Sequence, residues 1–360
     1  MKNLSKFIGI IALAVVIGFS FAACYNGDDS DGGSGGGGNQ GGNQGGNQGG
    51  GTGGPTNWIA IADIGFGSNT ITAIAYGSGR FVAGSYGSGY ATTTTMAYSY
   101  DGVTWIALPS NDDLYSIRAI AYGNNRFVAG GQIGRIAYSD NGINWTIVPD
   151  ANNPFYGYNS SIEAIAYEGG RWVAGGVSGK MAYSDDNGVT WTAVSNSTFS
   201  SYINSIAYGN NRFVAVGDNG EMAYSDDGIT WTAVQPGTNK SPGQTTFDDS
   251  NINGIAYGNN KFVAVNGNGQ MAYSTNGASW TAVSNPISIF YTNSIRAIAY
   301  GNGRFVAAGD ISIAYSSDGV TWTAVQMQNI ASFVPIYSLA YGNGRFVSVG
   351  QSGKMAYCDW

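Results

Sequence analysis

The sequence contains no histidine and only two cysteines among its 360 residues. Without an imidazole, the chain cannot build a Ser-His-Asp or Cys-His nucleophile or a metal site with histidine ligands. Two cysteines also supply too few ligands for a zinc finger. The sequence therefore excludes these classes of hydrolase and metal site, and it predicts neither a metal nor a cofactor.

Charged residues are also scarce, at 10% of the chain, with 15 basic residues, 22 acidic residues and a formal net charge of −7. Lys2 and Lys6 belong to an N-terminal leader described below, so the mature chain keeps 13 basic and 22 acidic residues. Nucleic-acid-binding proteins normally have the opposite sign of charge. We therefore expect no nucleic-acid partner.

Residues 1–24 have the pattern of a secretion signal. Two lysines precede Phe7–Ala23, an uncharged and mostly apolar run that ends at Phe21-Ala22-Ala23-Cys24. Small residues before a cysteine resemble the lipobox of bacterial lipoproteins, which implies that Cys24 is acylated and becomes the mature N-terminus. Phe21 departs from the leucine usual there, which leaves simple cleavage or a retained anchor open. The resemblance implies a lipid-anchored protein of the bacterial cell envelope, periplasmic or at the cell surface.

Residues 25–57 are rich in glycine, with three Asn-Gln pairs separated by glycine pairs. The segment has no apolar residues able to nucleate a core, so we expect a disordered linker. A flexible chain of about 30 residues spans roughly 30 Å. That length would hold a domain clear of a lipid surface.

From Ile71 onward, one phrase recurs at intervals of 41 to 49 residues, with copies that begin at Ile71, Ile117, Ile162, Ile203, Ile252, Ile295 and Ile336. Each copy divides into four pieces rich in β-branched and aromatic residues, for instance Ile117–Tyr122, Arg126–Ala129, Arg135–Ser139 and Trp145–Val148. Such a period with short strands is typical of propellers. The sequence predicts an all-β propeller in which each copy is a four-stranded antiparallel blade.

The last turn of six copies carries an Asp-Gly or Asn-Gly pair: Asp101-Gly102, Asn141-Gly142, Asn187-Gly188, Asp227-Gly228, Asn276-Gly277 and Asp318-Gly319. Such pairs tolerate positive φ angles, so they predict a type I′ hairpin turn. A serine three or four residues before each glycine is expected to hydrogen-bond the turn backbone. A tryptophan three residues after it is expected to pack on the neighbouring sheet.

One of these turns, Ser184–Trp191, fits the pattern S-x-D-x-G-x-x-W, and the other five, such as Ser225–Trp231, are one residue shorter. This motif resembles the Asp-box, or BNR repeat, of sialidase-like propellers. The resemblance implies a structural turn on the face opposite the active site, built here by Ser184, Asp186, Gly188, Trp191, Asp227 and Trp231. It implies no activity. Calcium binding by these aspartates is the alternative, but each turn offers too few carboxylates for a calcium cage.

Seven copies begin, but only six contain a fourth strand before the chain stops at Trp360. The segment Trp58–Ile61 resembles the missing strand. We expect it to complete the seventh blade, because closure removes two sheet edges and ties the termini together. The prediction is one domain of seven blades over residues 58–360. Cys358 then replaces the serine of the repeat and should be buried.

Function is sought where the copies differ, in the linking loops on one face and at two variable strand positions. The second residue of strand one is expected at the mouth of the channel: Thr72, Arg118, Glu163, Asn204, Asn253, Arg296 and Tyr337. The residue that opens strand three includes Arg135, Lys180 and Glu221. These side chains either form a ligand site or are ion-paired fillers of a wet channel.

The linking loops also hold aromatic residues outside the repeat pattern: Phe66, Tyr115, Phe155, Tyr156, Tyr158, Phe199, Tyr202, Phe247, Phe290, Tyr291 and Phe333. Gathered on one face, they suit stacking on sugars or docking of a protein. The alternative is that they cap the hydrophobic ends of the blades. Tyr156 and Tyr291 are the members we assign to the binding face.

The resulting prediction is a membrane-tethered module that binds a carbohydrate or a protein. A glycoside hydrolase without histidine is an alternative, with Glu163, Arg118, Arg296 and Tyr337 as catalytic candidates. A sialidase needs an arginine triad and an Arg-Ile-Pro motif, and the sequence has no such motif. An assembly factor for a membrane complex is the other alternative. The fold by itself does not decide among them.

Overall fold

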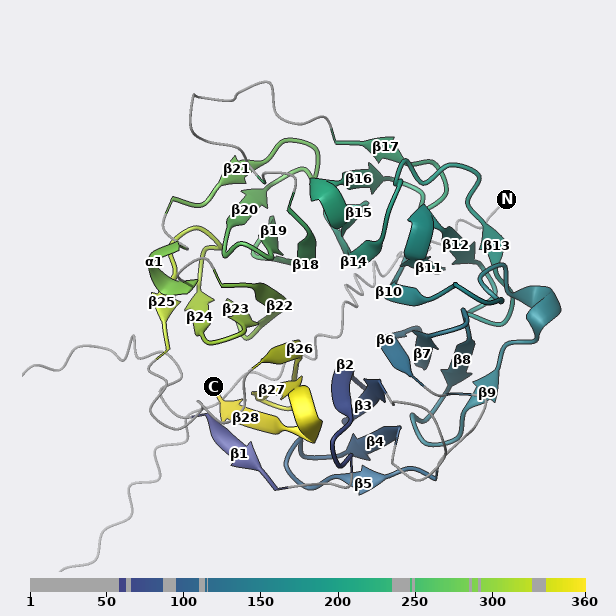
Figure 1. Cartoon of the computed structure of the whole chain (residues 1–360), viewed down its shortest axis with the longest axis horizontal. Helices are drawn as coiled ribbons and strands as arrows, with labels where there is room; N and C mark the ends of the chain where they lie inside the picture. The colour runs from purple at the N-terminus through teal and green to yellow at the C-terminus, as the bar shows by residue number, and fades with distance from the viewer. Residues whose placement is uncertain are drawn as a thin grey trace, which may run out of the picture.

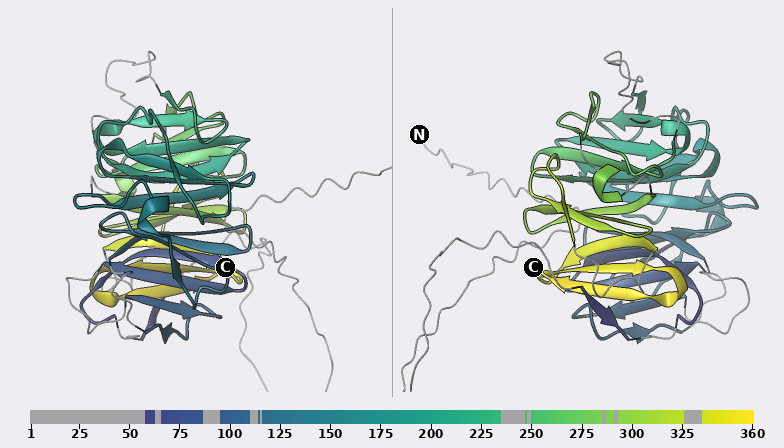
Figure 2. Two further views of the ribbon diagram at one scale, coloured as in Figure 1. Left: turned by 90° about the vertical axis from the view of Figure 1, so that its right-hand side faces the viewer. Right: turned by 60° about the vertical axis from the view of Figure 1, so that its left-hand side comes forward.

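The structure is a computed structural model that describes residues 58–62, 66–86, 95–109, 114, 116–234, 247, 250–284, 287–290, 293–325 and 335–360. These residues form seven four-stranded antiparallel sheets around a central axis (Figure 1). From the side, the ring is a thick disc (Figure 2). The protein is therefore a seven-bladed β-propeller, and the prediction from the repeats is confirmed.

The innermost strand of each blade, strand one, follows the axis: β2 (Thr70–Gly77), β6 (Ile117–Gly123), β10 (Ile162–Glu168), β14 (Ile203–Gly209), β18 (Ile252–Gly258), β22 (Ile295–Gly301) and β26 (Ile336–Gly342). Strand two lies outside it: β3 (Arg80–Tyr86), β7 (Arg126–Gly131), β11 (Arg171–Gly176), β15 (Arg212–Gly217), β19 (Lys261–Asn266), β23 (Arg304–Gly309) and β27 (Arg345–Gly350). We number the blades one to seven in this order.

Strand three follows: β4 (Met96–Ser99), β8 (Ile136–Ser139), β12 (Met181–Ser184), β16 (Met222–Ser225), β20 (Met271–Ser274), β24 (Ile313–Ser316) and β28 (Met355–Asp359). The outermost strands are short: β5 (Ile106–Ala107), β9 (Thr146–Ile147), β13 (Thr192–Ala193), β17 (Thr232–Ala233), β21 (Thr281–Ala282), β25 (Thr323–Ala324) and β1 (Ile59–Ile61). The helical segments are η1 (Asp150–Asn152), η2 (Val177–Gly179), η3 (Asp218–Gly220), η4 (Gln351–Gly353) and α1 (Ile287–Phe290). Within the described ranges, no helix has the length and apolar character needed to span a membrane.

The hydrophobic core lies between the blades. In strand β3, Phe81 and Ala83 pack against blade seven while Val82 packs against blade two, and all three are fully buried. A strand buried on both faces reads as a continuous apolar run, which explains the recurrent Arg-Phe-Val-Ala sequence. Each blade therefore buries both faces against its neighbours, and the closed ring leaves no blade face uncovered.

Blade seven is completed by the two ends of the described chain. Strand β1 pairs with β28, with Ile59 opposite Tyr357 and Ile61 opposite Met355 (Figure 1). Trp58 and Ile61 are buried, and Ile59 faces solvent. Cys358 is buried opposite Phe346, where Ser99 lies opposite Phe81 in blade one. The predicted closure and the burial of Cys358 are confirmed.

The predicted type I′ turn is wrong for five of the six turns, whereas in the sixth both Asn187 and Gly188 have positive φ. That turn needs positive φ at both central residues, but Gly228 has a φ of 73° and Asp227 is not among the residues with positive φ. The Asp227 carboxylate instead accepts hydrogen bonds from the backbone N–H groups of Ile229 and Thr230, at 2.8 and 2.7 Å. In these five turns the acidic or amide side chain, and not a positive φ, explains the residue before the glycine.

We call the segment from the strand-three serine to the tryptophan the box turn. Its serine and tryptophan make the contacts that the sequence predicts. Gly228 donates its N–H to Ser225 Oγ at 2.8 Å, and Trp231 is buried between blades three and four. The longer turn Ser184–Trp191 uses Asp186 as the acceptor for Thr190, with Asn187 at a φ of 61°. Its extra residue therefore moves the accepting side chain one position back.

Candidate functional site at the mouth of the channel

The second residue of strand one reaches the channel because it lies in a β-bulge. In every blade the register between strands one and two shifts at this residue, as between Ile117 and Ala119 on either side of Arg118. A bulge redirects the side chain that it contains. All seven side chains line one cavity of about 420 Å³: Thr72, Arg118, Glu163, Asn204, Asn253, Arg296 and Tyr337. We call this cavity the mouth, and the face on which it opens the mouth face.

Three of the seven side chains connect neighbouring blades. Each donates a hydrogen bond to the carbonyl of the first isoleucine of the next blade: Thr72 to Ile117, Asn204 to Ile252 at 3.1 Å, and Asn253 to Ile295 at 2.8 Å. Asn204 also donates to the Asp218 carboxylate at 2.8 Å. The side chains of blades one, four and five are therefore engaged in holding the ring together.

The side chains of blades six and seven form a neutral pair. Arg296 Nε lies 2.5 Å from the Asp310 carboxylate, and the guanidinium carbon lies 4.9 Å from the centre of the Tyr337 ring. The ion pair cancels the charge of the guanidinium, and the ring covers one side of it. This part of the mouth offers an aromatic surface without net charge.

The side chains of blades two and three are charged and have no ion-pair partner among the described residues. The Arg118 guanidinium stacks 4.4 Å from the centre of the Tyr86 ring, and its Nε is buried without a hydrogen bond. Neither Arg118 nor Glu163 takes part in an ion pair among the described residues, although both line the mouth. One positive and one negative group therefore line the mouth from adjacent blades.

The residues that precede strand three do not line the mouth. Arg135 pairs with Asp150 at 2.7 Å and stacks 4.6 Å from the centre of the Tyr156 ring. Glu221 accepts hydrogen bonds from the N–H and hydroxyl groups of Ser200, at 3.0 and 2.6 Å. Arg135 and Glu221 thus fasten the loops that surround the mouth, while Lys180 is exposed.

The loop aromatics divide by type. Phenylalanines cap the junctions between blades: Phe66, Phe155 and Phe290 are fully buried, and Phe199 and Phe247 are partly buried. Tyrosines face solvent, with Tyr156 and Tyr202 exposed and Tyr158 91% exposed. The phenylalanines thus cap the blades, and the tyrosines stay at the surface. Tyr115, Tyr291, Phe333 and the proposed lipidation site Cys24 lie outside the described residues.

Below the mouth, the channel passes a waist and then a ring of tyrosines. The waist is formed by Ile74, Ile120, Ile165, Ile206, Ile298 and Leu339, which line both the mouth and a second cavity of about 250 Å³, and by Ile255, which lines the second cavity. The second cavity is lined by Tyr76, Tyr122, Tyr167, Tyr208, Tyr257, Tyr300 and Tyr341. Burial raises the pKa of Tyr76, Tyr208 and Tyr300, so these phenols stay neutral near pH 7.

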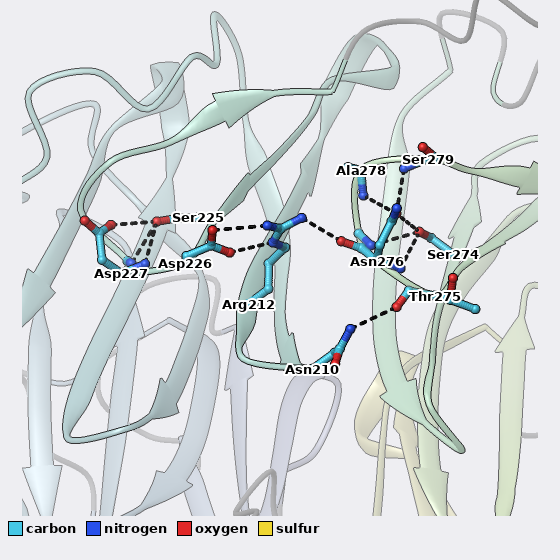
Figure 3. Close-up of polar contacts among 12 residues, drawn as sticks. Asn210, Arg212, Ser225, Asp226, Asp227, Ser274, Thr275, Asn276, Ala278 and Ser279 are labelled. Atoms are coloured by element: carbon cyan, nitrogen blue, oxygen red, sulfur yellow. Dashed lines mark hydrogen bonds and ion pairs between the residues drawn. The ribbon is translucent and has the colours of Figure 1, made fainter.

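The opposite face, which we call the turn face, carries the box turns and a staple between blades. In blade four, Arg212 pairs with Asp226 at 2.6 Å and donates to the Asn276 carbonyl of the blade-five box turn at 2.9 Å (Figure 3). Equivalent staples begin at Arg126, Arg171 and Arg345. The hydrogen bond from Arg212 lowers the pKa of Asp226. These arginines are therefore accounted for by structure and are remote from the mouth.

The bulge was missed by sequence reasoning, although a signal for it exists. In a regular strand, residues on one face alternate with period two. Ile71 and Ile74 are three residues apart and yet pack in the same cluster between blades seven and one. Spacing of three between buried isoleucines, repeated in the copies, indicates one extra residue between them. That residue is the one whose side chain enters the mouth.

Among the described residues, no group of three or more Asp, Glu or Cys residues gathers as a set of metal ligands. The four catalytic candidates, Glu163, Arg118, Arg296 and Tyr337, do share the mouth. Asp218 lines it as well but accepts a hydrogen bond from Asn204. Glu163 is thus the one carboxylate at a bulge position.

Comparison with known proteins supports the fold and does not identify a family. No protein-family model and no curated protein sequence matches the chain, so the Asp-box resemblance gains no support from that source. Among solved structures, YCF48 bound to a D1 peptide is 16% identical, with a TM-score of 0.62 over 86% of this chain and 96% of that one. YCF48 from Cyanidioschyzon merolae is 15% identical, with a TM-score of 0.58 over 84% and 98%.

A catalytically inactive virginiamycin B lyase from Staphylococcus aureus, in complex with quinupristin, is 10% identical, with a TM-score of 0.65 over 84% of this chain and 99% of that one. The inactive lyase has a histidine replaced by alanine, and the present chain contains no histidine that could take such a role. At these identities the likeness shows the fold alone. By fold, the chain is similar to YCF48, which is seen bound to a D1 peptide, and to virginiamycin B lyase, which is seen with quinupristin.

Proposed function

We propose that the propeller binds a segment of a partner protein at the mouth. The observation that carries this proposal is the composition of the bulge position. The neighbouring positions of strand one are nearly constant among the copies because they pack between blades. The bulge position carries five residue types in the seven blades, and four of its side chains, Arg118, Glu163, Arg296 and Tyr337, donate no hydrogen bond to the next blade among the described residues.

The size and surroundings of the mouth favour a chain segment over a flat protein surface. Its volume of about 420 Å³ lies in the lower part of the range of ligand pockets, roughly 300 to 1,000 Å³. Exposed tyrosines on the surrounding loops, Tyr156, Tyr158 and Tyr202, supply rigid aromatic contact area. The solved complex of YCF48 with a D1 peptide supports the proposal, since that propeller of similar fold binds a peptide.

The test is selection of binding peptides from a random library, followed by measurement of Kd by fluorescence anisotropy. Truncation of a stacked aromatic anchor should weaken binding, so we expect Tyr337→Ala to raise Kd at least about tenfold. Tyr100→Ala is the matched control, because Tyr100 also lies 4.9 Å from an arginine, Arg80, but on the turn face. Binding that is lost with Tyr100→Ala and kept with Tyr337→Ala would place the ligand elsewhere.

A carbohydrate ligand is the second candidate, and Tyr158 is the observation that favours it. A tyrosine that is 91% exposed offers a full ring face for stacking on a sugar. A glycan array probed with the wild type and Tyr158→Ala tests this candidate. A signal that the substitution leaves unchanged would contradict it.

We propose binding and not glycoside hydrolysis. The usual mechanisms of glycosidases need two carboxylates beside the scissile bond. At the mouth, Glu163 is available, whereas Asp218 is hydrogen-bonded by Asn204 and Asp310 is paired with Arg296. Release of a fluorophore from a panel of glycosides, with loss of that activity in Glu163→Gln, would contradict this proposal.

We also infer a lipid tether at Cys24, followed by the glycine-rich linker, in a bacterial cell envelope. The support is the sequence alone, with its apolar run and the Phe21-Ala22-Ala23-Cys24 motif. Cys24→Ala should move the full-length protein from the membrane fraction to the soluble fraction. Retention in the membrane fraction would refute the lipid anchor while leaving the proposed ligand site unaffected.

A further inference from the structure

Arg118 and Glu163, which form no ion pair among the described residues, occupy equivalent positions on neighbouring inner strands. Arg118 is the bulge residue of β6 in blade two, and Glu163 is the bulge residue of β10 in blade three. Both line the mouth. A guanidinium and a carboxylate placed in this way would ordinarily form an ion pair, and the absence of one from the described residues needs a cause.

Tyr86 supplies the cause. It ends strand β3 of blade one, and its ring centre lies 4.4 Å from the Arg118 guanidinium carbon. Arg118 therefore stacks toward the preceding blade, whereas Glu163 stands on the following blade. The stacking holds the positive group away from the negative one. Both side chains line the mouth, so it carries opposite charges on two adjacent blades.

The rest of the mouth does not compensate either charge. Asp310 is paired with Arg296, and Asp218, which keeps its negative charge while it accepts a hydrogen bond from the neutral amide of Asn204, forms no ion pair with Arg118 among the described residues. Thr72 and Asn253 donate to backbone carbonyls of the next blade. Charges that are partly withdrawn from water are costly unless they are paired. A ligand that brings a charge of each sign would remove both costs at once.

We propose that Arg118 and Glu163 form a two-charge subsite that selects a partner segment with an acidic and a basic side chain close together. This inference rests on the proposed function, because it assigns the chemistry of the segment bound at the mouth. The acidic group contacts Arg118, and the basic group contacts Glu163. A segment with one charge only would satisfy one side and be repelled by the other, which is how binding sites reject wrong ligands.

The experiment is peptide-library selection with the wild type, Arg118→Gln, Glu163→Gln and Lys261→Gln, all as the full chain. For the wild type, we expect enrichment of peptides in which acidic and basic residues are adjacent or two residues apart. Arg118→Gln should lose the acidic preference and keep the basic one, and Glu163→Gln should do the reverse. Lys261→Gln removes a positive charge on the turn face, in strand β19, and should select as the wild type does.

A second measurement uses one selected peptide and its derivatives. Replacing the acidic residue of the peptide with glutamine should weaken binding to the wild type about tenfold, the factor that corresponds to about 1.4 kcal/mol. The same replacement should change Kd less than about twofold for Arg118→Gln. Thermal unfolding of each variant separates loss of a contact from loss of the fold, since neither side chain belongs to the hydrophobic core.

The outcomes distinguish this inference from the function on which it rests. Peptides that bind at the mouth, as judged by Tyr337→Ala, but show no paired charges would overturn the two-charge subsite and leave the proposed function intact. Equal loss of affinity for charged and neutral peptides in Arg118→Gln would overturn it too. Failure to select any peptide would contradict the proposed function, and the subsite with it.

Discussion

The glycine that ends strand one is required by space and not by backbone conformation. A Cβ atom on Gly77 would lie 2.0 Å from Cγ of Tyr122 in the next blade, and its φ is not in the left-handed region. The same contact recurs at Gly123, Gly209, Gly258, Gly301 and Gly342, each with the tyrosine of the following blade. Blade three has Glu168 at this place. The circle of tyrosines that lines the channel therefore packs directly against the backbone of these glycines.

We expect Gly77→Ala to destabilise the propeller by about 1 to 3 kcal/mol, the usual cost of overpacking a tight contact. Gly254→Ala is the matched control within strand one. A Cβ at Gly254 would meet its nearest atom at 3.4 Å, an ordinary contact distance. Urea unfolding of both variants measures the difference. Equal free energies of unfolding for the two variants would show that the Tyr122 side chain moves aside at little cost.

The carboxylate of the box turn makes the free energy of unfolding depend on pH in the acidic range. Burial alone would raise the pKa of Asp101, but hydrogen bonds from Val103, Thr104 and Ser99 outweigh it and bring the pKa to about 2, from 3.8. A lowered pKa in the folded state stabilises the protein above the unfolded value. That contribution is complete above about pH 4 and is lost as the pH falls toward 2.

Asp101→Asn should therefore make stability less dependent on pH between about 4 and 2, with little change at pH 7. Asparagine performs the same task in blade two, where Asn141 accepts from the backbone of Ile143 at 2.9 Å. Urea unfolding at a series of pH values gives the slope of the free energy of unfolding against pH. A slope equal to that of the wild type would mean that the Asp101 carboxylate does not titrate as described.

At the scale of elements, neighbouring blades are linked by the staple on the turn face. Arg212 combines an ion pair to Asp226, a hydrogen bond to the Asn276 carbonyl and stacking 4.2 Å from the centre of the Tyr224 ring. Asp226 is well exposed, so solvent screens the ion pair and limits it to about 0.2 to 1 kcal/mol. The bond to the next blade and the packing against Tyr224 do not depend on that carboxylate.

From this division we expect Arg212→Met to destabilise the protein by about 1 to 2 kcal/mol and Asp226→Asn by less than about 1 kcal/mol. In Asp226→Asn the guanidinium still reaches the Asn276 carbonyl. Thermal unfolding at low and high salt checks this, because salt should narrow the gap between wild type and Asp226→Asn only. A larger effect of Asp226→Asn would show that the ion pair dominates the staple.

Strand positions could be predicted from the sequence, but local geometry within elements could not. The repeat places strand one at Ile117, where β6 begins, because periodicity is a property of the chain itself. The backbone angles of Asp227 depend on its side chain accepting from Ile229 and Thr230, which a dipeptide rule does not register. The bulge at Arg118 likewise needed the spacing of buried isoleucines to be read across neighbouring blades.

For the candidate site, the sequence identifies which residues differ but not which of them remain available. Arg118 and Arg296 have the same position in the repeat and the same side chain. Arg296 is paired with Asp310, and Arg118 stacks on Tyr86 without an ion pair. Their partners come from loop and strand ends whose conformation no repeat specifies. The separation of engaged from available side chains is therefore a structural result.

At the scale of the whole molecule, the ring exists because its two ends share one blade. Ile61 of strand β1 and Trp58, which precedes the strand and is 3% exposed, pack in the clusters on either side of blade seven. Without β1, the outer edge of β28 would be exposed, along with the apolar surface that Trp58 and Ile61 cover. The same ring keeps Tyr337 of blade seven next to Thr72 of blade one at the mouth.

A chain that begins at residue 62 should therefore be less stable than one that begins at residue 57, by at least the roughly 3 to 5 kcal/mol expected for loss of a buried tryptophan. It should also self-associate, because an unpaired edge pairs with other chains. Ile59→Ala in the longer chain is the control, since Ile59 is 47% exposed and should cost less than about 0.5 kcal/mol. Thermal unfolding and light scattering measure both effects. A synthetic peptide of residues 55–65 should restore the monomer and the lost stability, whereas a truncated chain that is monomeric and stable would mean that blade seven closes without β1.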